Sequence, residues 1–168
     1  MYVPYFIADF QTLIGYNDIK SSPVYFYVQR NSSFSITNTP IPFVLSRLNI
    51  GGAMDLASGI FTAPRTGTYF FVFNGLGQFP SSSNIVVLDV AFYLNGNVIG
   101  MGDADDASKN VQDETFTFQL TLSLQAGDQT WLEITRMDTG TYLNDDFNHH
   151  THYSGWLLEE KISDSLKA

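Results

Sequence analysis

The sequence predicts an all-β fold, built as a two-sheet sandwich or jelly roll of antiparallel strands. Short apolar segments recur along the chain, and Gly, Pro, Asn or Asp residues bound them. Helix signals are nearly absent, so the crossover helices that a parallel sheet needs are missing. The 168 residues suffice for one domain with its own core, and the chain contains no cysteine, which excludes a disulfide framework.

The first expected strands are short and lie close together. Residues 24–30, 41–49 and 59–63 are apolar segments bounded by Pro or Gly, and each predicts a strand. Residues 86–100 predict two strands joined by Asn95-Gly96, a dipeptide that supplies the positive φ angles of a tight hairpin turn.

The second half of the chain gives the clearest strand, residues 115–125 (TFTFQLTLSLQ). Phe and Leu alternate there with Thr, Gln and Ser, which predicts one dry face and one wet face. Residues 127–137 enter a strand through a Gly-Asp turn, and residues 153–160 predict the last strand. We expect about nine or ten strands in all.

The strand that contains residues 69–73 (YFFVF) departs from alternation, because all five residues are large and apolar. Both faces of this strand are therefore expected to be buried against other parts of the protein or against another subunit. Two alternatives remain open for the outer face. Either a long loop or the N-terminal extension covers it, or aromatic residues of neighbouring subunits meet there.

Domain boundaries follow from the strand pattern. The domain is expected to span residues 21–160. Residues 1–20 form an N-terminal extension, either a stalk remnant or a strand cap, and residues 161–168 form a C-terminal tail.

Charge and hydropathy exclude several classes of partner. The net charge is −9 and no run of Lys or Arg occurs, so nucleic acid and anionic membranes are poor partners. No apolar run approaches the roughly 20 residues of a membrane-spanning helix, so membrane insertion is not expected. One glycosylation triplet, Asn31-Ser32-Ser33, favours an extracellular location weakly.

The sequence offers no catalytic constellation, and an enzyme is not expected. There is no cysteine and no G-x-S-x-G elbow, and His149, His150 and His152 all lie in one segment. Three copies of that segment on a symmetry axis would complete a zinc site. An exposed polar loop is the favoured interpretation.

An acidic segment, residues 102–114, has the length of a calcium-binding loop. It lacks the glycine and one ligand that an EF-hand needs, and no helices flank it, so the EF-hand reading is rejected. A solvated hairpin loop is favoured, although clustered carboxylates bind hard cations without any motif. The weaker calcium candidates are Asp103, Asp105 and Asp106.

Residues 49–75 resemble the signature of the complement C-one-q globular head domain. The resemblance extends in order through LNG (94–96), LQAGDQTWLEI (124–134) and YSGWLL (153–158), and it covers roughly residues 22–160. Within the signature G-x-F-x-x-P-x-x-G-x-Y-x-F, the matching positions are Gly59, Phe61, Pro64, Gly67, Tyr69 and Phe71.

The departures from the family pattern are small. Tyr153 and Trp156 stand where the family usually has Phe, and Thr130 stands where Val is common. No Gly-X-Y repeat of a collagenous stalk is present in the chain.

This resemblance implies a ten-stranded jelly roll of two antiparallel sheets that assembles as a homotrimer. In this family the aromatic strand lies near the trimer interface, and some relatives hold calcium near the trimer apex. By region, Asp145 and Asp146 are the best match to such a calcium site, which makes calcium the one cofactor we expect. The expected interface residues are Tyr69, Phe71, Phe73 and Tyr93.

The resemblance implies a secreted, non-enzymatic recognition module that binds a protein, glycan or microbial surface through its loops. The alternatives are a receptor ligand like tumour necrosis factor and a structural or adhesive matrix trimeriser. The expected contact loops are residues 31–40, 78–84, 102–113 and 138–151. The expected contact residues are Asp103, Asp105, Asp106, Asn144, His149 and His150.

Overall fold

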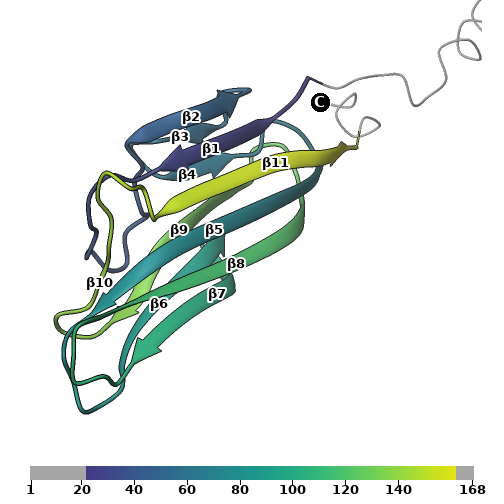
Figure 1. The fold of residues 1–168 in the computed structure, drawn as a ribbon. Helices are drawn as coiled ribbons and strands as arrows, with labels where there is room; N and C mark the ends of the chain where they lie inside the picture. Colours follow the sequence, from purple (N-terminus) through teal and green to yellow (C-terminus); the bar gives the residue numbers. More distant parts are fainter. Residues whose placement is uncertain (1–21, 162–168) are drawn as a thin grey trace, which may run out of the picture.

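The computed structural model describes residues 22–161, which fold as two antiparallel sheets packed face to face (Figure 1). The predicted all-β jelly-roll fold is confirmed. The expected N-terminal extension, residues 1–20, lies outside the described residues, as does the tail beyond residue 161.

The first sheet has the strand order β10-β5-β11-β1-β2, and β8 pairs with β5. Its longest strands, β5 and β8, are antiparallel over thirteen paired positions, from Gly67↔Leu124 to Phe79↔Gln112. The strands are β1 (Tyr25–Gln29), β2 (Leu45–Ile50), β5 (Gly67–Phe79), β8 (Gln112–Leu124), β10 (Tyr142–Leu143) and β11 (His152–Glu160).

The second sheet has the order β3-β4-β9-β6-β7. The predicted Asn95-Gly96 turn joins β6 to β7, with φ angles of 49° and 86° at these two residues. The strands are β3 (Met54–Asp55), β4 (Ile60–Thr62), β6 (Val86–Leu94), β7 (Asn97–Asp106) and β9 (Gln129–Met137).

The core between the sheets is largely aromatic. The Phe71 ring lies with its centroid 5.4 Å from that of Phe61 and 5.3 Å from that of Phe92. Gly155 of β11 makes this packing fit, because a Cβ atom there would lie 2.6 Å from the rings of Phe26 and Phe71. The glycine of the YSGWLL segment is therefore required by close packing of the core.

Some strand bounds differ from the prediction. The expected strand 41–49 begins only at Leu45, although Ile41 and Phe43 are buried and donate backbone hydrogen bonds to Leu132 and Leu56. The expected loop 102–113 is mostly strand, and only residues 107–111 connect β7 to β8. The two-residue strands β3 and β10 were not predicted. The bounds of β10 depend on its distant partner β5, and β3 forms a short hairpin with β4.

The two ends of the sandwich differ in what they carry. The start of β1 and the end of β11, which lead toward the two chain termini, lie at one end (Figure 1). The opposite end, here named the apex, carries the loops 80–85, 107–111 and 144–151, since these follow or precede strand ends that pair there.

Candidate functional site

The outer face of the first sheet carries a row of aromatic side chains. Pairing places Trp156 of β11 between Phe70 of β5 and Tyr25 of β1. The ring centroids of Phe70 and Trp156 lie 4.8 Å apart. Because the residues that alternate with them fill the core, these rings point outward, and Trp156 is 36% exposed.

The next row toward the apex extends this apolar surface. Ser154 lies between Tyr27 of β1 and Val72 of β5, and Leu48 of the edge strand β2 lies opposite Tyr27. A groove lined by Tyr27, Leu48 and Trp156 runs along this surface. The five residues here named the aromatic face are Tyr25, Tyr27, Phe70, Val72 and Trp156.

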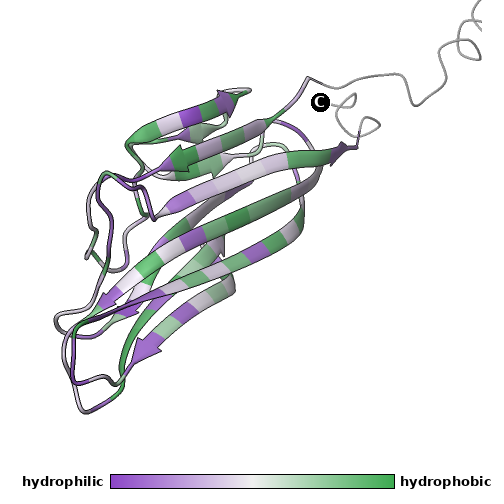
Figure 2. Cartoon of the chain, viewed as in Figure 1, coloured by the Kyte–Doolittle hydropathy of each residue, from purple (hydrophilic) through white to green (hydrophobic). Residues whose placement is uncertain are grey.

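Polar residues bound the aromatic face on the β8 side. Thr121 lies opposite Phe70, and Gln119 lies opposite Val72. The apolar residues of β5, green in Figure 2, therefore adjoin the polar outer side of β8. The alternation predicted for residues 115–125 thus sets one edge of the apolar patch.

Three of the expected interface residues lie in the core instead. The side chains of Tyr69, Phe71 and Phe73 are 0% exposed, because they point between the two sheets. Within the chain these three side chains contribute to the core and not to an outer face, and the interface role expected for them stays a prediction. Tyr93 lies on the second sheet, stacked on Trp131 with 5.4 Å between ring centroids, and its interface role stays a prediction.

The loop of residues 144–151, here named the apex loop, is organised by the buried carboxylate of Asp145. Its Oδ1 accepts hydrogen bonds from the backbone N–H groups of Asp146 (2.7 Å) and His150 (3.2 Å). Its Oδ2 accepts one from the N–H of Thr151 (2.9 Å). Since Asp145 is only 5% exposed, the exposed carboxylate of the Asp145-Asp146 pair is Asp146.

A buried cation, Arg30, lies beneath the apex loop. Its Nε donates to the carbonyl of Ser32 (3.0 Å), and its guanidinium carbon lies 4.9 Å from the Phe34 ring centroid. Burial lowers the pKa of Arg30, whereas the Asp145 carboxylate raises it. The Nδ1 atom of His149 lies 2.8 Å from the Arg30 carbonyl oxygen, which only accepts, so Nδ1 carries the proton.

The tip of the apex loop presents exposed groups. Phe147 is 81% exposed, and the backbone N–H of Asn148 donates to Asp146 Oδ1 (2.7 Å), which forms the turn around it. The Nε2 atom of His150 lies 3.9 Å from Asp146 Oδ1. The fold therefore gathers three expected contact residues in one loop. They are Asn144, His149 and His150.

The acidic residues of β7 lie on the second sheet and not in a loop. Asp103 is exposed and lies opposite Asp89 of β6, whose other neighbour is Arg136 of β9. Asp105 is exposed on the same side, and the Asp106 carboxylate accepts a hydrogen bond from the Ser108 N–H (2.9 Å). The expected loop cluster is therefore a strand with two outward carboxylates.

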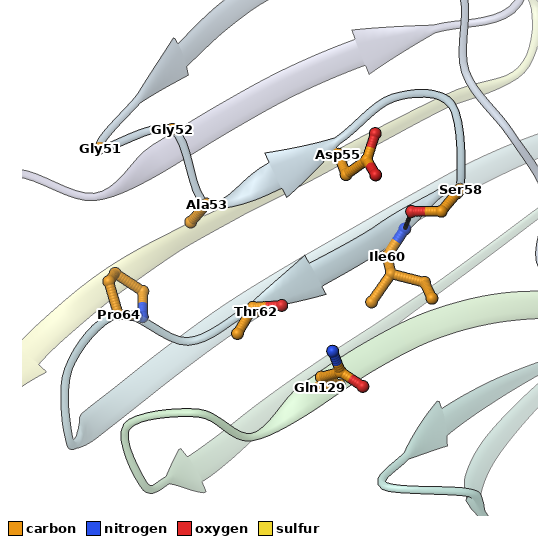
Figure 3. A pocket seen from close by; sticks show the side chains of 9 residues that line it. All are labelled: Gly51, Gly52, Ala53, Asp55, Ser58, Ile60, Thr62, Pro64 and Gln129. Atoms are coloured by element: carbon orange, nitrogen blue, oxygen red, sulfur yellow. Dashed lines mark hydrogen bonds between the residues drawn. The ribbon is translucent and has the colours of Figure 1, made fainter.

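Figure 3 shows a polar hollow beside the β3–β4 hairpin. Ser58 Oγ accepts a hydrogen bond from the Ile60 N–H (3.3 Å), and Asp55 Oδ1 accepts one from the Ala57 N–H (3.0 Å). The hydrogen bond from the Ser58 hydroxyl, followed by that from Ala57, lowers the pKa of Asp55. Among the described residues that line this hollow, Asp55 alone is charged, and its carboxylate accepts a hydrogen bond within its own turn.

Metal ligands do not gather in the described part of a single chain. In residues 22–161, no three His, Asp or Glu side chains lie close enough to hold a metal ion together. The three histidines diverge, since His152 lies in β11 with its ring 5.7 Å from that of Tyr27. A calcium site that includes Asp146 would need carboxylates of further chains, and it stays a prediction.

Nothing in the part of the chain that the structure describes resembles a membrane-crossing helix, either in length or in apolar character.

Sequence reasoning missed most of the aromatic face. The signals were present, since Tyr25 and Tyr27 alternate with core residues and Trp156 stands where the family usually has Phe. Phe147 carried no signal, because its exposure depends on a turn held by Asp146. The role of Arg30 also depends on residues far along the chain.

Comparison with known sequences identifies one domain family. The profile of the C1q domain, the complement C-one-q head, matches residues 25–158. Caprin-2 from Danio rerio is 33% identical over 137 residues, which are 80% of this chain and 14% of that protein. Complement C1q tumor necrosis factor-related protein 3 from Mus musculus is 34% identical over 130 residues, 76% of this chain and 48% of that protein. The chain thus spans less than half the length of either relative.

Two solved structures share the fold. The globular domain of zebrafish complement 1qA protein has a TM-score of 0.60 and 18% identity, over 82% of this chain and 99% of its own. Eiger TNF from S. frugiperda has a TM-score of 0.65 and 11% identity, over 83% of this chain and 95% of its own. At these identities the likeness concerns the jelly roll alone.

Proposed function

This chain belongs to the C1q domain family, and we propose that it works outside the cell as a homotrimeric recognition module without enzymatic activity. Three identical binding surfaces on one rigid body multiply weak contacts, raising affinity for clustered ligands by about 10²–10⁴ over a single site. Low affinity for an isolated ligand and strong binding to a crowded surface are the expected behaviour.

The observation that carries this proposal is the aromatic face. An acidic chain with net charge −9 presents Tyr25, Phe70 and Trp156 as one outward row. Soluble monomers rarely leave a large contiguous apolar patch uncovered. Further copies of the same chain are the cover that we propose.

A second apolar strip supports a cyclic arrangement of copies. A closed three-fold ring uses two different patches on each chain, one for each neighbour. The strand β7, at the edge of the second sheet, exposes Val98 (49%), Ile99 (37%) and Met101 (51%). We propose that this strip of one chain packs against the aromatic face of the next.

Ligand contact is proposed for the apex loop. The loop is held in shape by the Asp145 carboxylate, so little conformational entropy is lost on binding. Its tip displays Phe147, an exposed aromatic side chain of the kind that anchors many interfaces. The apex lies at the end of the sandwich opposite the start of β1 and the end of β11 (Figure 1).

Calcium is proposed to bind between chains and not within one. Asp146 is the exposed carboxylate of the apex loop, and three-fold symmetry would supply three copies of it. Like charges brought together either bind a cation or repel each other. A trimer mass that falls on addition of a chelator is the expected sign of such a site.

Trp156→Asp tests the proposed assembly. We expect a folded monomer, because a charge in the aromatic face would lose its water on assembly without gaining a partner. The measurement is the molar mass by light scattering, together with the circular dichroism spectrum. Wild type should show the mass of three chains.

Ile36→Asp is the matched control, because Ile36 is 56% exposed in a loop outside the aromatic face. It should remain trimeric with an unchanged spectrum. A monomeric wild-type protein, or a Trp156→Asp variant that keeps the trimer mass, would contradict the proposal.

A further inference from the structure

We propose that Asn31 is an acceptor for an N-linked glycan. The proposal rests on the proposed extracellular function, because only a chain that enters the secretory pathway meets the transferring enzyme. Asn31-Ser32-Ser33 is the only Asn-x-Ser/Thr triplet among the 168 residues. Any glycan of this type would therefore occupy a single, defined position.

The reaction places defined demands on the acceptor. The co-reactant is an oligosaccharide linked to a lipid through pyrophosphate. A bond forms between Asn31 Nδ2 and the first sugar carbon, the bond from that carbon to the pyrophosphate oxygen breaks, and the lipid pyrophosphate leaves. The amide nitrogen loses one proton to a base. The acceptor amide must therefore be reachable and free of competing bonds.

Asn31 meets these demands in the folded chain. It is exposed, as are Ser32 and Ser33, and it lies two residues beyond the last residue of β1, Gln29. Within residues 22–161 its side-chain amide makes no hydrogen bond, so a sugar on Nδ2 would displace no contact of the fold.

The backbone on both sides of Asn31 is held in place. The guanidinium of Arg30, 5% exposed, donates to the carbonyls of Ser32 (3.0 Å) and Ser33 (3.4 Å). The Ser33 hydroxyl lies 3.1 Å from Asn144 Oδ1. A glycan would therefore project from a fixed base and leave the anchoring contacts of its neighbours intact.

The position of Asn31 determines what a glycan would cover. Asn31 lies beyond the apex end of β1, past Tyr25 and Tyr27 of the aromatic face, so the glycan is compatible with a trimer built on that face. The contacts of Ser33 with Asn144 and of Arg30 with His149 hold the triplet against the apex loop. The glycan would therefore flank that loop and restrict ligand approach from this side.

The test is expression of the full 168-residue chain behind a secretory leader in animal cells, with analysis of both medium and cell-associated protein. Peptide mass mapping before and after treatment with peptide N-glycosidase identifies the modified residue. We expect one glycan on Asn31 in wild type. Asn31→Gln and Ser33→Ala should lack it, Ser33→Thr should retain it, and Ser32→Ala is the matched control that keeps the triplet.

Wild-type protein that enters the pathway and carries an unmodified Asn31 would overturn the proposal. Because transfer precedes export, cell-associated chains decide the question even when little protein is secreted. Light scattering of the same samples keeps the two proposals apart. A glycosylated monomer would support the Asn31 site and contradict the trimer, whereas an unglycosylated trimer would do the reverse.

Discussion

The outer faces of the two sheets differ in chemistry, although both belong to one sandwich. On the first sheet Trp156 packs on Phe70, with 4.8 Å between ring centroids. On the second sheet Asp89 lies between Asp103 and Arg136. The first face is apolar over several strands, whereas the second presents the charges of Asp89, Asp103 and Arg136 to water beside the exposed apolar strip of β7.

The difference shows which face gains from being covered. Covering apolar surface is favourable by about 25 cal/mol per Å². Covering the charged face would remove water from carboxylates that have few cationic partners, which is costly. The aromatic face of the first sheet is therefore suited to assembly, whereas on the second sheet the apolar strip of β7 is suited to it and the charged stretch around Asp89 is not.

The largest expected effect separates the two faces of β5. Phe71→Asp should prevent folding, because it buries an unpaired charge among the rings of Phe61 and Phe92. Such a substitution lowers the free energy of unfolding by more than about 4 kcal/mol. Phe70→Asp, one residue earlier, should leave a folded monomer. Circular dichroism and light scattering measure both outcomes. If Phe70→Asp also unfolded the chain, the outer position would belong to the core and the comparison would fail.

A smaller effect is expected at the apex, where a buried carboxylate can be compared with an exposed neighbour. Asp145→Asn weakens three hydrogen bonds from backbone N–H groups and removes the charge near Arg30. A hydrogen bond to a charged group contributes about 1.5–3 kcal/mol to stability. We therefore expect Asp145→Asn to lower the free energy of unfolding by at least this amount. The measurements are urea unfolding and amide hydrogen exchange of residues 144–151.

Asp146→Asn is the matched control for the stability change expected of Asp145→Asn. The side chain of Asp146 is half exposed, and surface changes usually stay within about 0.5 kcal/mol. Equal losses for the two variants would show that Asp145 does not anchor the loop.

The smallest expected effect lies on the charged face, at Asp89. Burial raises the pKa of Asp89, Arg136 lowers it, and Asp103 and Asp138 raise it further, so the net shift is upward from 3.8. A carboxyl group whose pKa is raised by folding stabilises the folded state when the pH is below its unfolded-state pKa. This stabilisation is lost as the pH rises through its folded-state pKa.

Asp89→Asn should therefore be more stable than wild type at neutral pH, by up to about 0.5 kcal/mol, as is usual for surface changes. The gain should disappear in acid, where Asp89 is protonated. Urea unfolding of both proteins between about pH 3 and pH 7 tests this. A gain that is independent of pH would show that the effect comes from packing and not from charge.

Most strands could be predicted because their signals are local. The alternation in residues 115–125 and the Asn95-Gly96 turn involve neighbours in sequence, and both appear in the structure as expected. The two-residue strand β10 could not be predicted, since pairing with Gly77, far away in sequence, defines it. The strand β3 pairs with nearby Phe61, but two residues are too few to show an alternating pattern. The family motifs were also local, and the family assignment is confirmed.

The presence of apolar residues on both sides of the YFFVF strand follows from the sequence, because composition is a local property. The side that is buried becomes clear from the fold, in which Tyr69 and Phe71 fill the core while Phe70 faces outward. The physical reason is the two-residue period of a strand. A shift of one residue in register exchanges the two faces, and when both faces are apolar only pairing with β8 and β11 fixes which one is buried.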